Sequence, residues 1–479
     1  MTAGMSDQST PTPDPHVLVL FGARGDLARR KLLPGLYRLG QTGLMPEDFR
    51  IIGSGRHEPE GEFAEEVKEA LEEHLEGDLE EEAWEEFAER LSFVSSSAEE
   101  ADELAEAVKR AREELGEDSR SLLYLSIPPS AMSAMVGMLA RSGLADERAR
   151  LVMEKPFGSD LESAKALNEE LHEHVAEEAI FRIDHFLGKE AAQDILALRF
   201  ANGLFEPIWN ARHIASVQID IPEDLGLEGR GSFYEETGAF RDMVVTHLSQ
   251  ILGFVGMEAP KTLEAGSLRD AKAKLFEDLQ PFDPKEAVFG QFEGYREEEG
   301  VADDSDTETF AAVRVRIENE RWQGVPFLLR TGKAMGENRR LVSVALREPA
   351  SQIFESAEGA EIRPDEIVIE LTDDPRIAVE LRVKVPGPSS LTTRASLSLD
   401  VERELQEQGL EAYERLLHDV MLGDHLLFAR ADEVERLWAC AAPLLEQPPR
   451  PLPYEQGSWG PEEAQDLAAP GGWRLPENG

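Results

Sequence analysis

The chain is strongly acidic, with 96 Asp and Glu against 49 Lys and Arg among its 479 residues and a formal net charge of −47. Such a surface repels nucleic acid and anionic membranes, which excludes both as partners and indicates adaptation to a salt-rich cytoplasm. The length allows two or more domains. The single cysteine, Cys440, excludes an intramolecular disulfide. Residues 1–15 lack the charged and apolar regions of a signal peptide, so we expect a disordered tail on a cytoplasmic protein.

The first expected unit is a strand, a glycine turn and a helix. The continuous apolar run His16–Phe21 predicts a buried strand, and a helix is expected from Arg30 onward. Glycines in such a turn let a pyrophosphate approach the backbone, and the helix start supplies N–H donors. The turn consists of Gly22, Ala23, Arg24, Gly25, Asp26 and Leu27. Its spacing is G-x-x-G-x-x-A rather than G-x-G-x-x-G, so a tight turn without a ligand explains the pattern equally well.

The second expected strand, Phe49–Gly53, bears on the choice of cofactor. An NAD site usually has an acid at the end of this strand, whereas an arginine favours the 2′-phosphate of NADP. Arg56 therefore predicts NADP, and the nearby Glu58 leaves NAD possible. The acidic segment 58–117 has apolar residues at helical spacing, which predicts solvated helices without chemistry.

Three later apolar runs predict strands that extend the same parallel sheet: Ser121–Ile127, Arg150–Met153 and Ile180–Ile183. Ligands bind at the C-terminal ends of strands in doubly wound sheets. Lys155 follows the second run closely, which makes it a candidate ligand-binding residue. An exposed turn is the alternative explanation for its E-K-P context.

A carboxylate, an imidazole and an ammonium group lie close together in Phe181–Glu190. A helix from Leu187 onward would place His185 and Lys189 on one face near its N-terminus, where phosphates bind readily. Asp184 would either cap this helix or hold a second imidazole as a general base. An exposed pair of polar residues four positions apart is the alternative.

The second half of the chain predicts a large, mainly antiparallel sheet covered by helices on one face. Its alternating runs are Ile214–Ile221, Leu341–Leu346, Glu366–Leu371 and Ile377–Val385. Asp242 and His247 lie five positions apart on a predicted helix, from which both can face a cleft. A single histidine among Val, Leu and Ile is alternatively a residue of the core. No cluster of His, Cys and acidic residues has metal-site spacing, so we expect no metal.

Several of these segments resemble one enzyme family. The string Phe181–Glu190 matches the R-I-D-H-Y-L-G-K-E signature of glucose-6-phosphate dehydrogenases at every position except Phe186. Residues 22–34 resemble the family's G-A-S-G-D-L-A-x-R-K-L-x-P motif, and residues 154–158 resemble its E-K-P-F-G. Residues 229–248 resemble its catalytic segment. The strand that ends in Arg330 and Lys333 resembles its P-F-x-x-R-x-G-K element.

The resemblance implies a domain organisation and an activity. Residues 16–185 would form an α/β, Rossmann-like dinucleotide-binding domain. Residues 186–479 would form an α+β domain that contains the large sheet, binds the substrate and assembles the chain into a homodimer or homotetramer. The expected reaction is the NADP-linked oxidation of a sugar phosphate, glucose 6-phosphate, at C1 to a phosphogluconolactone.

The same resemblance implies residue roles. His247 would remove the proton of the anomeric hydroxyl, and Asp184 would orient His247. The residues expected to bind substrate are Lys155, His185, Lys189, Glu223, Asp242 and Lys333. The residues expected to bind cofactor are Gly22, Ala23, Arg24, Gly25, Asp26, Leu27, Lys31, Arg56 and Lys155.

The chain departs from the family pattern at three places. Phe186 replaces a tyrosine whose hydroxyl contacts the sugar phosphate, which predicts weaker phosphate binding. Arg24 replaces Ser or Thr and would either bind the 2′-phosphate or swing out to solvent. A family arginine after Lys333 has no clear counterpart, since Arg339 and Arg340 are both offset. Two alternatives stay open: a dehydrogenase of the same fold for unphosphorylated glucose or another hexose, and a non-catalytic NADP-binding sensor.

Overall fold

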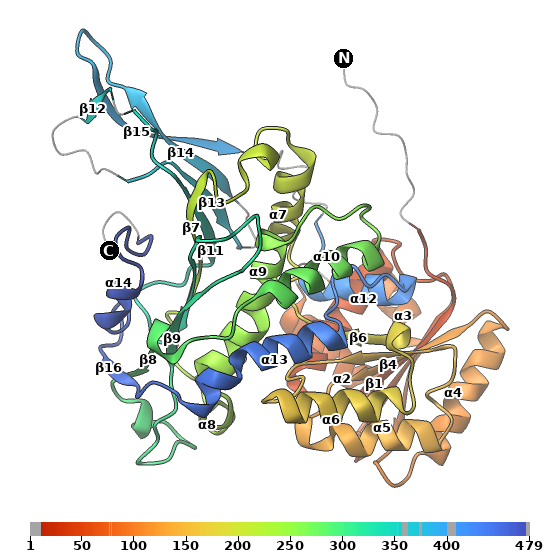
Figure 1. The fold of residues 1–479 in the computed structure, drawn as a ribbon. Coiled ribbons are helices and arrows are strands. Elements are labelled where there is room, and N and C mark those ends of the chain that lie inside the picture. The colour runs from red at the N-terminus through yellow and green to blue at the C-terminus, as the bar shows by residue number, and fades with distance from the viewer. Residues whose placement is uncertain are drawn as a thin grey trace, which may run out of the picture.

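Two sheets dominate the computed structural model, which describes residues 11–75, 77, 79–351, 353–356, 363–372, 376–399 and 409–475 (Figure 1). The first sheet has six strands in the order β3-β2-β1-β4-β5-β6, all paired in parallel. Its strands are β1 (His16–Phe21), β2 (Phe49–Gly55), β3 (Leu91–Ser95), β4 (Arg120–Leu125), β5 (Ala149–Met153) and β6 (Ile180–Arg182). This is the predicted Rossmann-like α/β fold.

Helices connect these strands and cover the sheet. They are η1 (Ala28–Leu32), α1 (Leu33–Gln41), α2 (Phe63–His74), α3 (Glu81–Ala88), α4 (Asp102–Leu115), η2 (Pro129–Ala131), α5 (Met132–Arg141), α6 (Leu161–His172) and η3 (Glu177–Ala179). Because both faces of the sheet are covered, β1 is buried along its whole length, which is why its sequence is continuously apolar.

The second sheet has ten strands in the order β12-β15-β14-β13-β11-β7-β10-β9-β8-β16. Its strands are β7 (Ile214–Pro222), β8 (Ala287–Phe292), β9 (Phe310–Val315), β10 (Phe327–Gly332), β11 (Leu341–Leu346), β12 (Glu355–Ser356), β13 (Glu366–Glu370), β14 (Ile377–Lys384), β15 (Leu391–Leu399) and β16 (Leu452–Tyr454). Most neighbours pair antiparallel, and β7 with β10 is a parallel exception at the centre. The predicted mainly antiparallel sheet is therefore confirmed.

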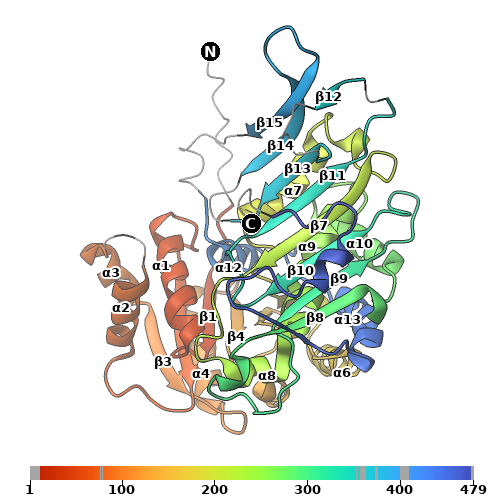
Figure 2. The same ribbon diagram turned by 90° about the vertical axis from the view of Figure 1, so that its left-hand side faces the viewer.

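The helices of the second half lie on both sides of the second sheet, and most of them lie on the side that faces the first sheet (Figure 1). They are α7 (Glu190–Ala201), η4 (Glu206–Ile208), α8 (Gly231–Ala239), η5 (Phe240–Leu248), α9 (Ser249–Gly256), α10 (Ala265–Asp278), η6 (Pro284–Glu286), η7 (Tyr295–Glu297), α12 (Ala412–Leu422), α13 (Ala431–Glu446) and α14 (Glu463–Leu467). η5 packs on β9 and β10, on the side of the second sheet that faces the first domain (Figure 1). β14 and β15 lie at the far end of that sheet (Figure 2).

Segments from the end of the chain pack on the first domain. Glu414 of α12 forms an ion pair of 3.2 Å with Arg38 of α1. The indole N–H of Trp438, in α13, donates a hydrogen bond of 3.0 Å to the carbonyl of Phe157. These contacts fix the first domain against the helices that carry the rest of the site. The predicted boundary at 185/186 stays a prediction.

Residues 1–10 of the predicted tail lie outside the described residues. Of the next five, Pro13 is buried, and the carbonyl of Pro15 accepts a hydrogen bond of 2.9 Å from the backbone N–H of Arg120. Within the described part of the chain, no helix combines the length and the apolar character needed to cross a bilayer.

Candidate active site

A buried carboxylate and imidazole meet where the two domains face each other. Asp184 follows β6 of the first sheet, and His247 lies on η5. Nδ1 of His247 is 2.6 Å from Oδ1 of Asp184, with side-chain exposures of 1% and 5%. Burial alone would raise the pKa of Asp184, but the neighbouring charge and hydrogen bond of His247 lower it to about 2. The pair is therefore an ionised carboxylate that holds an imidazole.

The turn after Asp184 corrects the expected start of α7. α7 begins at Glu190, with Lys189 as its N-cap residue, so the predicted helix from Leu187 starts too early. Oδ1 of Asp184 accepts the backbone N–H of Phe186 at 2.9 Å, which stabilises a turn in place of the first helical residues. The predicted shared helical face of His185 and Lys189 is therefore wrong. Asp184 was expected either to cap the helix or to hold a second imidazole, and in the structure it contacts the imidazole of His247.

η5 is a π-helix, whose hydrogen bonds link residues five apart. Asp242 and His247, which are five apart, therefore lie about one turn from each other on the same side. Helix η5 begins after a kink at Gly238, which has φ 66° and ψ 168°. Glu308 holds this start, because its carbonyl accepts the N–H of Ala239 and its Oε1 accepts the N–H of Phe240, each at 2.9 Å.

Two lysines predicted to bind substrate lie beside carboxylates. Nζ of Lys155 is 2.7 Å from Oδ1 of Asp242. Burial acts to raise the pKa of Asp242, but the charges of Lys155, His247 and Lys333 and the hydrogen bond of Lys155 together lower it. Lys333 forms an ion pair with Glu223, and its carbonyl accepts a hydrogen bond of 2.7 Å from the hydroxyl of Tyr454. The hydrogen bond from Tyr454 therefore fixes the backbone of Lys333, while the ammonium group of Lys333 points to Glu223.

Rings enclose His247. The ring of Phe186 stacks on His247 with centroids 4.4 Å apart, and His185 meets it edge-on at 4.8 Å. Tyr413 of α12 stacks on His185 at 6.2 Å. Burial, followed by the charge of His247, lowers the pKa of His185 well below its usual range. His185 is thus a neutral ring that can exchange hydrogen bonds with a ligand.

Asp184, His185 and His247 each place one potential metal-ligand atom within 4.8 Å of the others. The hydrogen bond between Asp184 and His247 already joins two members of this group. An acid–base role accounts for that pair, and the absence of a metal stays a prediction.

The glycine turn after β1 has the shape of a dinucleotide cradle. Gly22 has a φ of +74°, and a Cβ atom there would lie 2.1 Å from the carbonyl oxygen of Ser126. Only glycine fits this position, which keeps the turn close to the sheet and open to a pyrophosphate. Leu27 is the N-cap of η1, so the turn leads directly into a helix start, while Asp26 is exposed.

The predicted cofactor cations other than Lys155 pair with carboxylates of other segments or lie exposed. Arg24 binds the carboxylate of Glu66 on α2 through Nε at 2.7 Å and Nη2 at 2.9 Å. Lys31 forms an ion pair of 3.1 Å with Glu411, just before α12. Arg56 is exposed directly after β2. Arg24 was expected either to bind the 2′-phosphate or to swing out to solvent, and in the structure it is turned outward to the carboxylate of Glu66.

Sequence reasoning missed Glu154 and Tyr413 in this region and left the role of Arg340 open. The guanidinium of Arg340 lies 5.8 Å from the ring centroid of Phe186. Glu154 accepts a hydrogen bond of 2.5 Å from Tyr124 and interacts with Tyr413, and burial raises its pKa to about 7. Glu154 directly precedes Lys155, a predicted site residue, and this position could have identified Glu154 as a neighbour of the site. Tyr413 reaches the site from α12, and no local pattern predicts that.

Comparisons with known proteins cover nearly the whole chain. Residues 19–194 match the family described as glucose-6-phosphate dehydrogenase, NAD binding domain, and residues 196–474 match its C-terminal domain. Glucose-6-phosphate 1-dehydrogenase 2 of Mycobacterium bovis is 37% identical, across 96% of this chain and 95% of the relative. The enzyme of Dickeya dadantii is 38% identical, across 94% and 96%.

Solved structures of the same family superpose on nearly the whole chain. A glucose-6-phosphate dehydrogenase in complex with its substrate glucose-6-phosphate superposes with a TM-score of 0.89 at 32% identity, over 98% of this chain and 100% of the other. The glucose-6-phosphate 1-dehydrogenase of Mycobacterium avium gives 0.84 at 37% identity, over 97% and 99%. The chain therefore belongs to the glucose-6-phosphate dehydrogenase family.

Proposed function

We propose that the protein oxidises glucose 6-phosphate at C1 with NADP, and that His247 is the general base. The observation that carries this proposal is the buried pair of Asp184 and His247. Nδ1 of His247 is held by Asp184, and its buried Nε2 has no hydrogen-bond partner among the described residues. A buried polar atom without a partner is costly, so Nε2 is suited to a substrate hydroxyl.

In the proposed step, Nε2 of His247 takes the proton of the C1 hydroxyl as the C1–H bond gives up a hydride. The product is the 6-phosphogluconolactone. Asp184 keeps the proton of His247 on Nδ1, so that Nε2 can accept, and stabilises the positive charge that then forms. The remaining carboxylates, Asp242 and Glu223, bind sugar hydroxyls. Lys155 and Lys333, which pair with them, would bring positive charge to the anionic substrate.

The substrate phosphate is proposed to bind near the turn between Asp184 and α7. Lys189 is the N-cap residue of α7, so a phosphate there meets an ammonium group and the positive end of a helix. His185 contributes a neutral ring beside it. A relative solved with glucose 6-phosphate supports this choice of substrate.

The residues proposed to hold NADP are those of the turn at Gly22 to Leu27, with Lys31, Arg56 and Lys155. When bound, the nicotinamide supplies the hydride acceptor. Arg56 is exposed and can turn to a 2′-phosphate, whereas Arg24 must first leave Glu66. The acid at Glu58 accepts the backbone N–H of Ser95 at 3.3 Å, which gives it a structural partner. We therefore favour NADP over NAD.

The test is a set of initial rates in high salt, with glucose 6-phosphate and glucose each assayed against NADP and NAD. We expect turnover with glucose 6-phosphate that His247→Asn abolishes, because the amide of Asn is not a base that can accept the proton. The exposed His174→Asn is the matched control and should leave the rate unchanged. Turnover that survives His247→Asn would refute the assignment of the base.

One observation favours a second candidate, a dehydrogenase for unphosphorylated hexoses. Phe186, which stands where the family has tyrosine, stacks on His247 and offers no hydroxyl to a phosphate. Equal kcat/KM for glucose and glucose 6-phosphate would support that candidate.

We further propose a homodimer formed through the outer end of the second sheet. Leu381 and Val383 of β14 are 37% and 43% exposed, and Leu397 and Leu399 of β15 are 55% and 43% exposed. The antiparallel register pairs Leu381 with Ala395, so these side chains share one face. An apolar face of this kind marks a protein interface.

We place the protein in a salt-rich cytoplasm, because the related protein from Arabidopsis thaliana is named cytoplasmic.

A further inference from the structure

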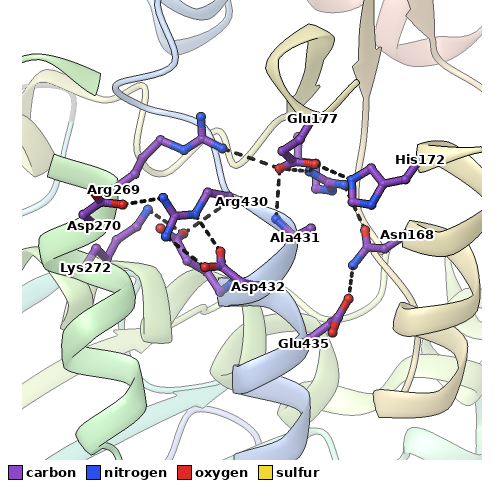
Figure 3. Close-up of polar contacts among 12 residues, drawn as sticks. Asn168, His172, Glu177, Arg269, Asp270, Lys272, Arg430, Ala431, Asp432 and Glu435 are labelled. Carbon is purple, nitrogen blue, oxygen red and sulfur yellow. Dashed lines mark hydrogen bonds and ion pairs between the residues drawn. The ribbon is translucent and has the colours of Figure 1, made fainter. Parts of the chain in front are cut away.

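The carboxylate of Glu177 lies at a junction between the domains (Figure 3). Glu177 begins η3, just before β6, the strand that leads to Asp184. Within the first domain it accepts hydrogen bonds from Arg182 at 2.8 and 3.0 Å and contacts His172 at 2.8 Å. From the second domain it accepts the backbone N–H of Ala431 at 3.1 Å and meets Nη2 of Arg269 at 3.5 Å.

Arg182 transmits these contacts to the strand. It lies two residues before Asp184 and has no exposed surface. Its Nη2 donates to Asn168 at 2.9 Å, and Asn168 in turn donates to Glu435 of α13 at 2.9 Å. The carbonyl of Arg182 accepts the N–H of Ala429 at 3.2 Å. The end of β6 is thus held from its side chain and from its backbone.

The other side of the junction leads to His247. Ala431 is the first residue of α13, and two residues later Glu433 forms a fully buried ion pair of 3.1 Å with Lys272 of α10. Nζ of Lys272 also donates to Oε1 of Gln250 at 2.8 Å. Gln250 lies three residues after His247, on the helix that continues η5. Polar contacts and short pieces of backbone therefore form a closed ring with the hydrogen bond between Asp184 and His247.

We infer that Glu177 is a positioning residue for the reaction, which holds the strand of Asp184 in register with the helix of His247. Asp184 and His247 come from different domains, so their contact depends on how the domains are fixed to each other. Glu177 is the one carboxylate of Figure 3 that accepts hydrogen bonds both from the strand before Asp184 and from α13. The inference rests on the roles proposed above for His247 and Asp184.

The test combines Glu177→Gln with Asp184→Asn in the full-length protein. The amide keeps the shape of Glu177 but loses its charge and one acceptor. We expect Glu177→Gln to lower kcat with glucose 6-phosphate and NADP by about ten-fold to 100-fold, as expected for misplaced catalytic groups. The KM for NADP should not change. In an Asp184→Asn background the same substitution should lower kcat by less than about two-fold, because the contact it supports is already lost.

The matched control is Glu178→Gln, which changes the exposed neighbouring carboxylate and should leave kcat unchanged. If Glu177→Gln does not fold, Ala431→Pro removes the N–H donated to Glu177, at a helix position where proline is tolerated. Equal losses of kcat in both backgrounds, or no loss at all, would overturn the positioning role. Full activity of Asp184→Asn alone would instead refute the roles of the pair.

Discussion

Replacing Phe186 by tyrosine would restore the hydroxyl that the chain lacks beside the pair of Asp184 and His247. The ring of Phe186 is 5% exposed and stacks on His247 at 4.4 Å, and a tyrosine differs from it by a single hydroxyl. A new hydrogen bond to a phosphate would contribute about 1.5–3 kcal/mol, which is roughly a 10-fold to 150-fold lower KM. We therefore expect Phe186→Tyr to lower the KM for glucose 6-phosphate and to leave kcat nearly unchanged.

The assay for Phe186→Tyr compares glucose 6-phosphate with glucose. The KM for glucose should not change, because glucose has no phosphate to accept the new hydrogen bond. Phe186→Leu is the control for the ring itself and should lower kcat, since His247 loses its stacking partner. An unchanged KM for glucose 6-phosphate in Phe186→Tyr would refute the reasoning and would place the phosphate elsewhere.

Three further predictions concern charge, cofactor and assembly. Lowering the pKa of Asp184 from 3.8 to about 2 stabilises the folded state by about 2 kcal/mol above pH 4, and this stability is lost as the pH falls towards 2. In urea titrations over this range, the free energy of unfolding of Asp184→Asn should therefore depend less on pH. Arg56→Ala should raise the KM for NADP about ten-fold and leave that for NAD unchanged. Leu397→Asp should yield monomers in sedimentation experiments if β15 forms the dimer interface.

Local sequence patterns predicted the most apolar strands but missed others, such as β8, β9 and β3, which lies in the segment 58–117 that was expected to be helical. β1 and β7 follow from their apolar patterns, because burial on one or both faces dictates those residues. The start of α7 was predicted three residues early, because the hydrogen bond from Phe186 to Asp184 competes with the first helical turn. A side-chain acceptor of this kind leaves little trace in a periodic pattern.

Contacts between distant segments are the second reason why the sequence did not predict the whole site. The motif predicted a cofactor role for Arg24, but its partner Glu66 lies on α2, one of many acidic residues in that region. Helix η5 begins after the kink at Gly238, and its first N–H is bound by Glu308, which belongs to a different segment. The family resemblance supplied the role expected of His247, and the structure supplied its neighbours.

The acidic chain has a consequence for anion binding. Lys31, Lys155 and Lys333, all proposed to bind substrate or cofactor, already face carboxylates: Glu411, Asp242 and Glu223. An incoming phosphate must therefore compete with a carboxylate for each lysine that it uses. Salt screens the repulsion between a phosphate and a chain of charge −47, and it also weakens exposed ion pairs such as the one between Lys31 and Glu411. Both effects lower the cost of exchanging a carboxylate for a phosphate, so anion binding in this protein should strengthen with salt.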